Sequence, residues 1–221
     1  RFAPSAHSID GAGHVRALWV ATFAGLNYWD RIHNTFTFYE IDPKLPDTIA
    51  YAIYEDTVRG TLWLGTTMGL ERITLPPDGV GPPPELDITR ILTRTSRSRG
   101  LVTDLHPAGD DQIWMAHYEI GLSRFDLARE VIVATFQVDP ENDNSLSDDR
   151  VTDIAAGQDG TLWVTTRTGI EHFDPATGRF THYLHDPDDP QSVAERVIAL
   201  YQDEESIVWL GSEGAGLQRF D

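Results

Sequence analysis

Residues 159–170 read DGTLWVTTRTGI. Four related stretches occur elsewhere, so the chain carries five copies of this motif. In each copy a Trp follows an aliphatic residue, and Gly-Leu or Gly-Ile stands six or seven positions after that Trp. The copies run from Leu18 to Leu26, Leu62 to Leu70, Ile113 to Leu122, Leu162 to Ile170 and Val208 to Leu217. Successive tryptophans lie 44, 51, 49 and 46 residues apart, a period typical of propeller blades and too long for heptads or leucine-rich repeats.

Each repeat carries the pattern of four short strands. An aliphatic stretch such as 151–154 leads into Asp159-Gly160, which is a hairpin signal because both residue types tolerate positive φ. A short alternating segment such as 169–174 follows the Gly, and an aromatic strand such as 180–184 follows a turn. Such repeats predict an all-β fold, a β-propeller of four-stranded antiparallel blades with about five blade repeats and helices of at most a turn or two.

The repeats also predict element boundaries. The approximate blades are 1–42, 43–92, 93–141, 142–190 and 191–221, with the first and the last incomplete. Strands are expected near 50–55, 61–66, 69–74, 101–106, 112–117, 121–126, 131–138, 151–155, 161–166, 169–174, 180–184, 197–202, 207–212 and 216–220. The proline-rich stretch 76–84 is expected to form a rigid loop inside the second blade.

The tryptophans of the repeat are predicted to pack between blades, each burying roughly 150–250 Å² of surface. The Gly that follows permits a tight turn between the second and third strands of a blade. Trp29 replaces the Phe of other copies of the third strand and is predicted to be a core residue as well. Arg72, Arg124 and Arg219 recur at one repeat position, which favours a structural role over an anion clamp.

The composition limits the partners. With 35 acidic and 17 basic residues the net charge is −18, so the chain should be soluble and should repel nucleic acid and anionic lipid surfaces. The absence of Cys excludes disulfides and leaves the redox compartment open. No run of about 18 apolar residues and no signal peptide occurs, so any membrane anchor is expected to lie outside this segment.

Metal-binding and catalytic patterns are weak. The eight His residues are scattered without a metal-ligand spacing, so they are interpreted as surface or strand residues and not as zinc ligands: His117, His172, His182 and His185. The Asp-rich connectors 139–144 and 186–189 lack the Gly and the terminal Glu of a calcium loop, and Asx turns explain them better. The sequence therefore predicts no metal, no cofactor and no catalytic residue.

Two longer strings carry a family resemblance. Residues 61–70 and 159–170, together with the connector 136–151 and its weaker copy 183–197, resemble the two-component regulator propeller repeat. The resemblance covers almost the whole chain. It implies the periplasmic or extracellular sensor region of a bacterial inner-membrane receptor, a hybrid histidine kinase or a diguanylate cyclase, with carbohydrate as the ligand class.

The number of copies is smaller than the resemblance implies. Such sensors carry seven-bladed propellers, which at this period need roughly 320 residues, whereas this chain has 221. We therefore expect part of a larger propeller whose exposed blade faces self-associate, for example as a homodimer. In the alternative, residues 1–9 return to supply the missing fourth strand of the fifth blade and close a five-bladed ring.

The predicted function is a non-catalytic sensor module that binds a small molecule or an oligosaccharide. Loops joining the second to the third strand and the fourth to the first gather on one propeller face, so the candidate ligand-binding residues are His117, Tyr118, Glu119, Arg167 and Glu213. One alternative is a propeller glycosidase or lyase, because residues 158–163 resemble the Asp-box turn of sialidases. Another alternative is a protein-interaction scaffold of the WD-repeat kind.

Overall fold

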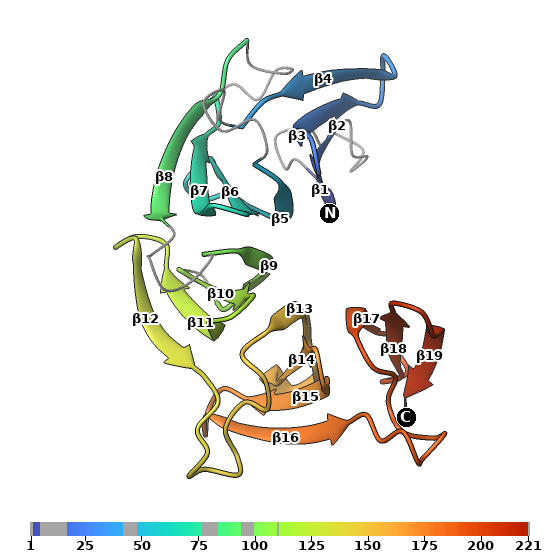
Figure 1. The fold of residues 1–221 in the computed structure, drawn as a ribbon. Helices are drawn as coiled ribbons and strands as arrows, with labels where there is room; N and C mark the ends of the chain where they lie inside the picture. Colours follow the sequence, from blue (N-terminus) through green and yellow to red (C-terminus); the bar gives the residue numbers. More distant parts are fainter. Residues whose placement is uncertain are drawn as a thin grey trace. The chain divides into compact units, whose positions relative to one another are not determined.

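The computed structural model describes residues 2–4, 17–41, 48–76, 84–93, 100–109 and 111–220. These residues form five antiparallel sheets, and their only helix is the single 3-10 turn η2, Gln158–Gly160 (Figure 1). The first two sheets contain β1 Phe2–Pro4, β2 Ala17–Thr22, β3 Gly25–Asp30 and β4 Thr35–Tyr39, then β5 Ala50–Asp56, β6 Thr61–Thr66, β7 Gly69–Thr74 and β8 Asp87–Thr93. The third and fourth contain β9 Val102–Pro107, β10 Gln112–His117, β11 Gly121–Asp126 and β12 Val131–Phe136, then β13 Val151–Ala156, β14 Leu162–Thr166, β15 Gly169–Asp174 and β16 Arg179–Leu184. The fifth contains β17 Val197–Gln202, β18 Val208–Ser212 and β19 Gly216–Phe220.

The sheets are those of an all-β propeller, as predicted, and the predicted strands are confirmed to within two residues. Every sheet is a meander in which strands adjacent in sequence pair with each other. Two compact units, residues 1–105 and 106–221, divide the chain within β9. Each unit is described by itself below.

The tryptophan of one sheet packs on the next sheet within each unit. In the second unit Trp114 of β10 meets Phe173 of β15 edge to face, with ring centroids 5.5 Å apart. Trp163 of β14 meets Phe220 of β19 in the same manner at 5.8 Å. In the first unit Trp19 is 2 % exposed and belongs to one core cluster with residues of β5, β6 and β7. The prediction that these tryptophans pack between blades is confirmed for Trp19, Trp114 and Trp163.

The prediction that Trp29 is a core residue is wrong. Trp29 is half-buried, stacks on Phe36 with ring centroids 5.7 Å apart, and donates a hydrogen bond from Nε1 to Asn34 Oδ1 at 3.3 Å. Its repeat position is that of Phe173, which faces the Trp of the preceding sheet. Trp29 lies in the first sheet of the described chain, and no described sheet precedes it to cover the indole.

The first sheet differs from the predicted pattern, whereas the fifth sheet has the three strands expected of an incomplete blade. Residues 2–4 form β1, which pairs with β2, so the first sheet has four strands where an incomplete blade was predicted. These three residues therefore do not supply the missing strand of the fifth sheet, as the closed-ring alternative requires, and residues 5–9 lie outside the described part. The fifth sheet has three strands, β17, β18 and β19, among the described residues. Residues 77–83 of the predicted proline-rich loop also lie outside the described part.

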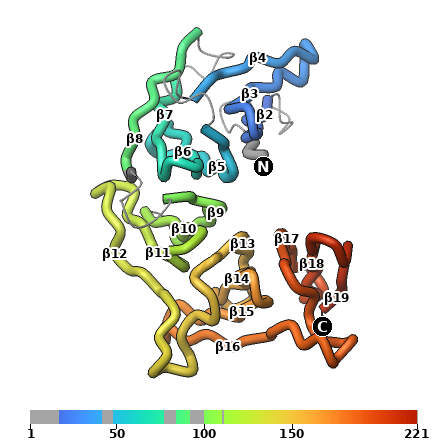
Figure 2. The backbone as a smooth tube through the Cα atoms, in the orientation of Figure 1, coloured from blue at the N-terminus to red at the C-terminus, as the bar shows by residue number. Residues whose placement is uncertain are grey.

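The acidic connectors are folded by their own side chains, as the Asx-turn interpretation predicted. In the connector 137–150, Asp139 accepts from the Glu141 amide at 3.0 Å, and Asn142 accepts from the Asn144 amide at 3.1 Å. Ser145 Oγ closes this loop on Asp139, and Ser192 closes the connector 185–196 in the same way. The connector 137–150 runs beside the sheet β13–β16, where the Phe180 amide donates to the Asn144 carbonyl at 2.9 Å (Figure 2).

Candidate ligand-binding site

Three strand ends of the second unit meet on one side of the sheets β13–β16 and β17–β19. Thr152 of β13 donates from Oγ1 to the Val197 carbonyl of β17 at 3.0 Å, which ties the two first strands together. The Glu213 amide, in the turn after β18, donates to the Arg196 carbonyl at 3.1 Å. Tyr118, just after β10, forms an isolated bridge with Arg150, just before β13. The turns after β10 and β18 are thus held against the starts of β13 and β17.

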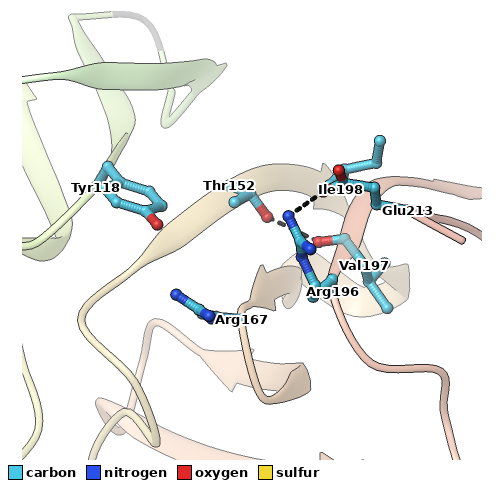
Figure 3. A pocket seen from close by; sticks show the side chains of 7 residues that line it. All are labelled: Tyr118, Thr152, Arg167, Arg196, Val197, Ile198 and Glu213. Atoms are coloured by element: carbon cyan, nitrogen blue, oxygen red, sulfur yellow. Dashed lines mark hydrogen bonds and ion pairs between the residues drawn. The ribbon is translucent and has the colours of Figure 1, made fainter.

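A hollow of about 130 Å³ lies between these strand ends, and we call it the rim hollow. Ligand pockets for drug-sized molecules usually measure about 300–1,000 Å³, so the rim hollow has room for one small chemical group and not for a whole drug-sized molecule. Figure 3 shows the Tyr118 hydroxyl and the Arg167 guanidinium pointing into the same space. Its lining consists of Tyr118, Thr152, Arg167, Arg196, Val197, Ile198 and Glu213.

The charges around the rim hollow are unequally paired. Arg196 forms an ion pair with Glu213 across the hollow edge. Arg150, next to Tyr118, donates from Nε to Asp148 Oδ1 at 2.8 Å and from Nη2 to Asp148 Oδ2, and these hydrogen bonds raise the pKa of its guanidinium. Arg167 is exposed, and its guanidinium makes no hydrogen bond or ion pair with a described residue. One of the three arginines therefore keeps its full donor capacity for a ligand.

Of the five residues predicted from the sequence, three line the rim hollow. Tyr118, Arg167 and Glu213 each occupy the first position after the second strand of a sheet, which explains why they converge. Glu119 follows Tyr118 in the same turn with a φ of 87° and lies outside the lining. Whether these residues bind a ligand stays a prediction.

His117 is placed differently from the prediction. As the last residue of β10 it is 3 % exposed, and its Nε2 lies 2.6 Å from Ser123 Oγ of β11. Burial lowers the pKa of the His117 imidazole to about 4, so the ring is neutral at physiological pH. Because side chains alternate along a strand, His117 points into the sheet packing while Tyr118 reaches the rim. His117 is therefore a core residue and not part of the rim hollow.

Sequence reasoning missed four residues of the lining: Thr152, Arg196, Val197 and Ile198. Arg196 has a φ of 57°, an uncommon conformation for Arg that turns the connector into β17. A usable signal existed, because Arg-Val occurs at the start of two repeats, at Arg150-Val151 and again at Arg196-Val197. That repetition marks the loop that joins the fourth strand of one sheet to the first strand of the next. This is one of the two kinds of loop that were predicted to form the ligand-binding face.

A second polar cluster lies away from the rim hollow. Glu171 of β15 is fully buried, and it accepts hydrogen bonds from Ser147 of the connector and from His182 of β16. His182 also bonds through Nε2 to the Asp143 carbonyl at 3.0 Å. These bonds fasten the connector 137–150 to its sheet, so we interpret the cluster as structural.

The described residues contain no group of three or more His, Asp or Glu side chains that could hold a metal ion. In the same part of the chain, no helix has the length and apolar character that crossing a membrane requires. Arg124 of β11 has a structural role, as predicted for its repeat position, since its guanidinium lies 5.6 Å from the Trp114 ring centre.

Solved structures with a similar fold include extracellular domains of bacterial signalling systems and a WD40 domain. The chain is similar to the extracellular domain of BT3049 from B. thetaiotaomicron, named a hybrid two component system, with 22% identity, a TM-score of 0.67 and coverage of 93% of this chain and 26% of that one. It is similar to the extracellular domain of BT4673 from B. thetaiotaomicron, named a one component system, with 21% identity, a TM-score of 0.69 and coverage of 93% and 26%. The WD40 β-propeller domain of Doa1 matches with 9% identity, a TM-score of 0.65 and coverage of 94% of this chain and 61% of that one.

These structural likenesses establish the β-propeller fold, and the sequence itself carries the family signal. The family model for the two component regulator propeller matches residues 145–168. These residues are thus similar to a two component regulator propeller repeat. The repeat begins in the connector and includes η2, β14 and Arg167 of the rim hollow. The chain spans about a quarter of the length of the two B. thetaiotaomicron domains, 26% of each. No curated protein matches the sequence significantly.

Proposed function

We propose that this propeller is a non-catalytic sensor module that binds an extracytoplasmic ligand in the rim hollow. The observation that carries the proposal is that three repeat-equivalent turn residues, Tyr118, Arg167 and Glu213, line one hollow of a propeller with a two component regulator repeat. The fold match to extracellular domains of signalling systems supports a place on the periplasmic or extracellular side of a bacterial inner membrane. The membrane anchor and a histidine kinase or diguanylate cyclase output then belong to other segments of the receptor.

Carbohydrate is the ligand class that fits the lining of the rim hollow. The Tyr118 ring and Ile198 offer apolar surface for the faces of a sugar ring. Thr152, Arg196 and Glu213 offer hydroxyl, guanidinium and carboxylate groups for sugar hydroxyls. The net charge of −18 disfavours nucleic acid as a partner.

Hydrolysis of the ligand is the less favoured alternative. Glycoside hydrolysis ordinarily uses two carboxyl groups, one on each side of the glycosidic bond. The lining of the rim hollow supplies one carboxylate, Glu213, and that carboxylate is ion-paired with Arg196. Binding without turnover therefore agrees better with the lining, although the likeness to a WD40 domain keeps a protein-interaction scaffold as a second candidate.

Calorimetry and melting with a panel of di- and oligosaccharides test the proposal. We expect at least one saccharide to raise the melting temperature through linkage, and Tyr118→Ala to remove that rise. Mass spectrometry of the incubated saccharides should show intact ligand. Saccharide cleavage that disappears in Glu213→Gln would favour the enzyme, and binding of none of the saccharides would contradict the sensor proposal.

We also propose that the chain associates with a second copy through its end sheets. By register, Tyr201 and Trp209 share one face of β17–β19 with Leu217, and Tyr201 and Leu217 are 62% and 71% exposed. Trp29 and Phe36 form an exposed aromatic pair on the first sheet, at the repeat position that receives a Trp elsewhere. Trp209 of one copy is thus suited to pack on Trp29 of another.

Sedimentation of the chain over a range of concentrations measures this association. Leu217→Asp and Trp29→Asp should each weaken self-association, because a charge in an apolar contact loses its hydration. A mixture of the two variants should form dimers and nothing larger, since each variant keeps one intact face. A monomer at all concentrations for the parent chain would contradict the proposal.

A further inference from the structure

We infer that the ligand of the rim hollow carries a monoanionic oxyanion, a carboxylate or a sulfate ester, and that Arg167 binds it. This inference rests on the proposed function and narrows the saccharide to an acidic one. It is carried by the charge and pairing of the side chains that line the rim hollow.

Arg167 differs from the other arginines of the rim. The chain has 35 acidic against 17 basic residues, so carboxylates are abundant relative to positively charged groups. Arg150 is bonded to Asp148, and Arg196 is paired with Glu213. The Arg167 guanidinium has neither kind of partner among the described residues, and it faces the hollow opposite the Tyr118 hydroxyl (Figure 3).

The net charge of the lining matches a monoanion. The lining contains two guanidinium groups, Arg167 and Arg196, and one carboxylate, Glu213, which gives a sum of +1. A single carboxylate or sulfate ester neutralises this charge, whereas a dianion would leave an excess negative charge beside Glu213. The planar guanidinium suits such groups because it can donate two parallel hydrogen bonds to a pair of oxygens.

Arg167 is also held in position by its turn. Thr166 donates from Oγ1 to the Gly169 carbonyl at 3.4 Å, and the Thr166 and Thr168 hydroxyls lie 3.2 Å apart. Thr168 Oγ1 lies 3.2 Å from Ser147 Oγ of the connector. A turn fastened at both ends limits the backbone freedom of Arg167, so less order has to be gained when an anion binds.

The test compares matched sugars on matched variants. The probes are cellobiose, the same disaccharide with its terminal CH₂OH oxidised to a carboxylate, and the same disaccharide with a 6-O-sulfate, with inorganic sulfate as a fourth arm. We expect at least one acidic disaccharide to bind about tenfold or more tightly than cellobiose, because a charge-assisted hydrogen bond is the stronger kind. This preference should decrease as salt is added.

Three variants locate the effect. Arg167→Gln should remove the preference for the acidic sugar, so that the acidic sugar and cellobiose bind with about equal affinity. Glu213→Gln should strengthen the preference, because it releases Arg196 and raises the charge of the lining from +1 to +2. Arg129→Gln, on an exposed turn outside the lining, removes one positive charge as well and should change nothing.

The outcomes separate this inference from the proposed function. If cellobiose binds as tightly as both acidic sugars, the inference is wrong and the saccharide-sensor proposal stands. If inorganic sulfate competes with the acidic sugars at equal concentration, the hollow is a free-anion site and the inference is likewise wrong. If no disaccharide binds, both proposals fail. If Arg167→Gln keeps the full preference for the acidic sugar over cellobiose, another residue binds the anion.

Discussion

Two neighbouring sheets of the second unit, β13–β16 and β17–β19, share the Trp-to-Gly motif but differ in burial. All five residues of β14 are buried, whereas only Val208 and Leu210 are buried in β18. Trp163 is 8 % exposed under Phe220, while Trp209 is half-buried and donates from Nε1 to Asp203 Oδ2 at 2.8 Å. The strand sequence decides which side chains share a face, and the neighbouring sheet decides which face excludes water.

The largest expected difference between these sheets is the effect of removing the tryptophan. Trp163→Ala should lower the free energy of unfolding by about 3–5 kcal/mol, because it leaves a cavity against Phe220. Trp209→Ala and Trp29→Ala should cost less than about 1 kcal/mol, since both indoles are already half in water. Urea unfolding followed by circular dichroism measures all three, and equal losses would contradict the packing interpretation.

Two glycines at the same repeat position sharpen the comparison. A Cβ on Gly121 would lie 2.2 Å from the Phe136 carbonyl oxygen of β12, whereas a Cβ on Gly216 would meet nothing within 4 Å. Both have positive φ, 86° and 80°, so Ala costs about 1–2 kcal/mol of backbone strain at either site. Gly121→Ala should therefore destabilise by about 3 kcal/mol and Gly216→Ala by about half as much. Similar losses in denaturant melts would mean that the strand beside Gly121 moves away freely.

The buried His117 makes an interior sheet sensitive to acid. Its folded pKa is lowered to about 4, so the unfolded chain takes up a proton below about pH 6.5 that the folded chain refuses. Stability should therefore fall as the pH drops from 6.5 towards 4, by about 2 kcal/mol at pH 5. Unfolding measured from pH 8 to pH 5 should show this slope, and His117→Gln should flatten it.

A matched variant separates the effect of burial on the pKa of His117 from the effect of its hydrogen bond. Ser123→Ala removes the oxygen that lies 2.6 Å from His117 Nε2 but leaves the imidazole buried. Since burial is the cause of the lowered pKa, the acid slope should persist in Ser123→Ala. The same slope in His117→Gln would assign the acid sensitivity to other groups.

Most of the fold was predictable because its signals are local. Asp159 and Gly160 adopt φ values of 60° and 77°, as the hairpin signal requires, and the motif positions set the strands and their order. The prediction for Trp29 failed because its repeat position is that of a core residue. The indole is half-buried, since no described sheet precedes the first one to cover it. Whether a side chain between two repeats is buried depends on the neighbouring sheet and not on the sequence of its own strand.

The candidate site was predictable in part for the same reason. Tyr118, Arg167 and Glu213 follow from their place after a strand, which periodicity locates to within a residue or two. His117 was assigned to the rim although it ends the strand, and a shift of one residue reverses the direction of a side chain. The pairing of Arg196 with Glu213 depends on tertiary contacts that the sequence does not encode locally.

The smallest expected effect concerns the fourth strand, which the interior sheet has and the end sheet lacks among the described residues. Glu171 faces His182 of β16, whereas Gln218, at the same position of β19, bonds the Ala194 amide and the Ser192 carbonyl, both at 2.9 Å. Burial raises the pKa of Glu171, and its hydrogen bonds with Ser147 and His182 only partly offset this rise. Burial also lowers the pKa of His182, but the bonds to Glu171 and the Asp143 carbonyl outweigh it, and the pKa is raised.

Both shifts mean that the folded chain holds protons more tightly than the unfolded chain. The Glu171 contribution is complete below about pH 4.5 and the His182 contribution below about pH 6.5, and each is lost as the pH rises through the raised folded pKa. His182→Arg should reduce the loss of stability at alkaline pH. The substitution reproduces the ion pair of Arg90 and Glu71 in the second sheet, whose Nη2 and Oε1 atoms lie 2.8 Å apart. The difference should stay below about 1 kcal/mol, since His182 is partly exposed. Parallel unfolding curves of the parent and His182→Arg from pH 6 to pH 9 would show that the pair does not titrate, and the two sheets would then differ in packing alone.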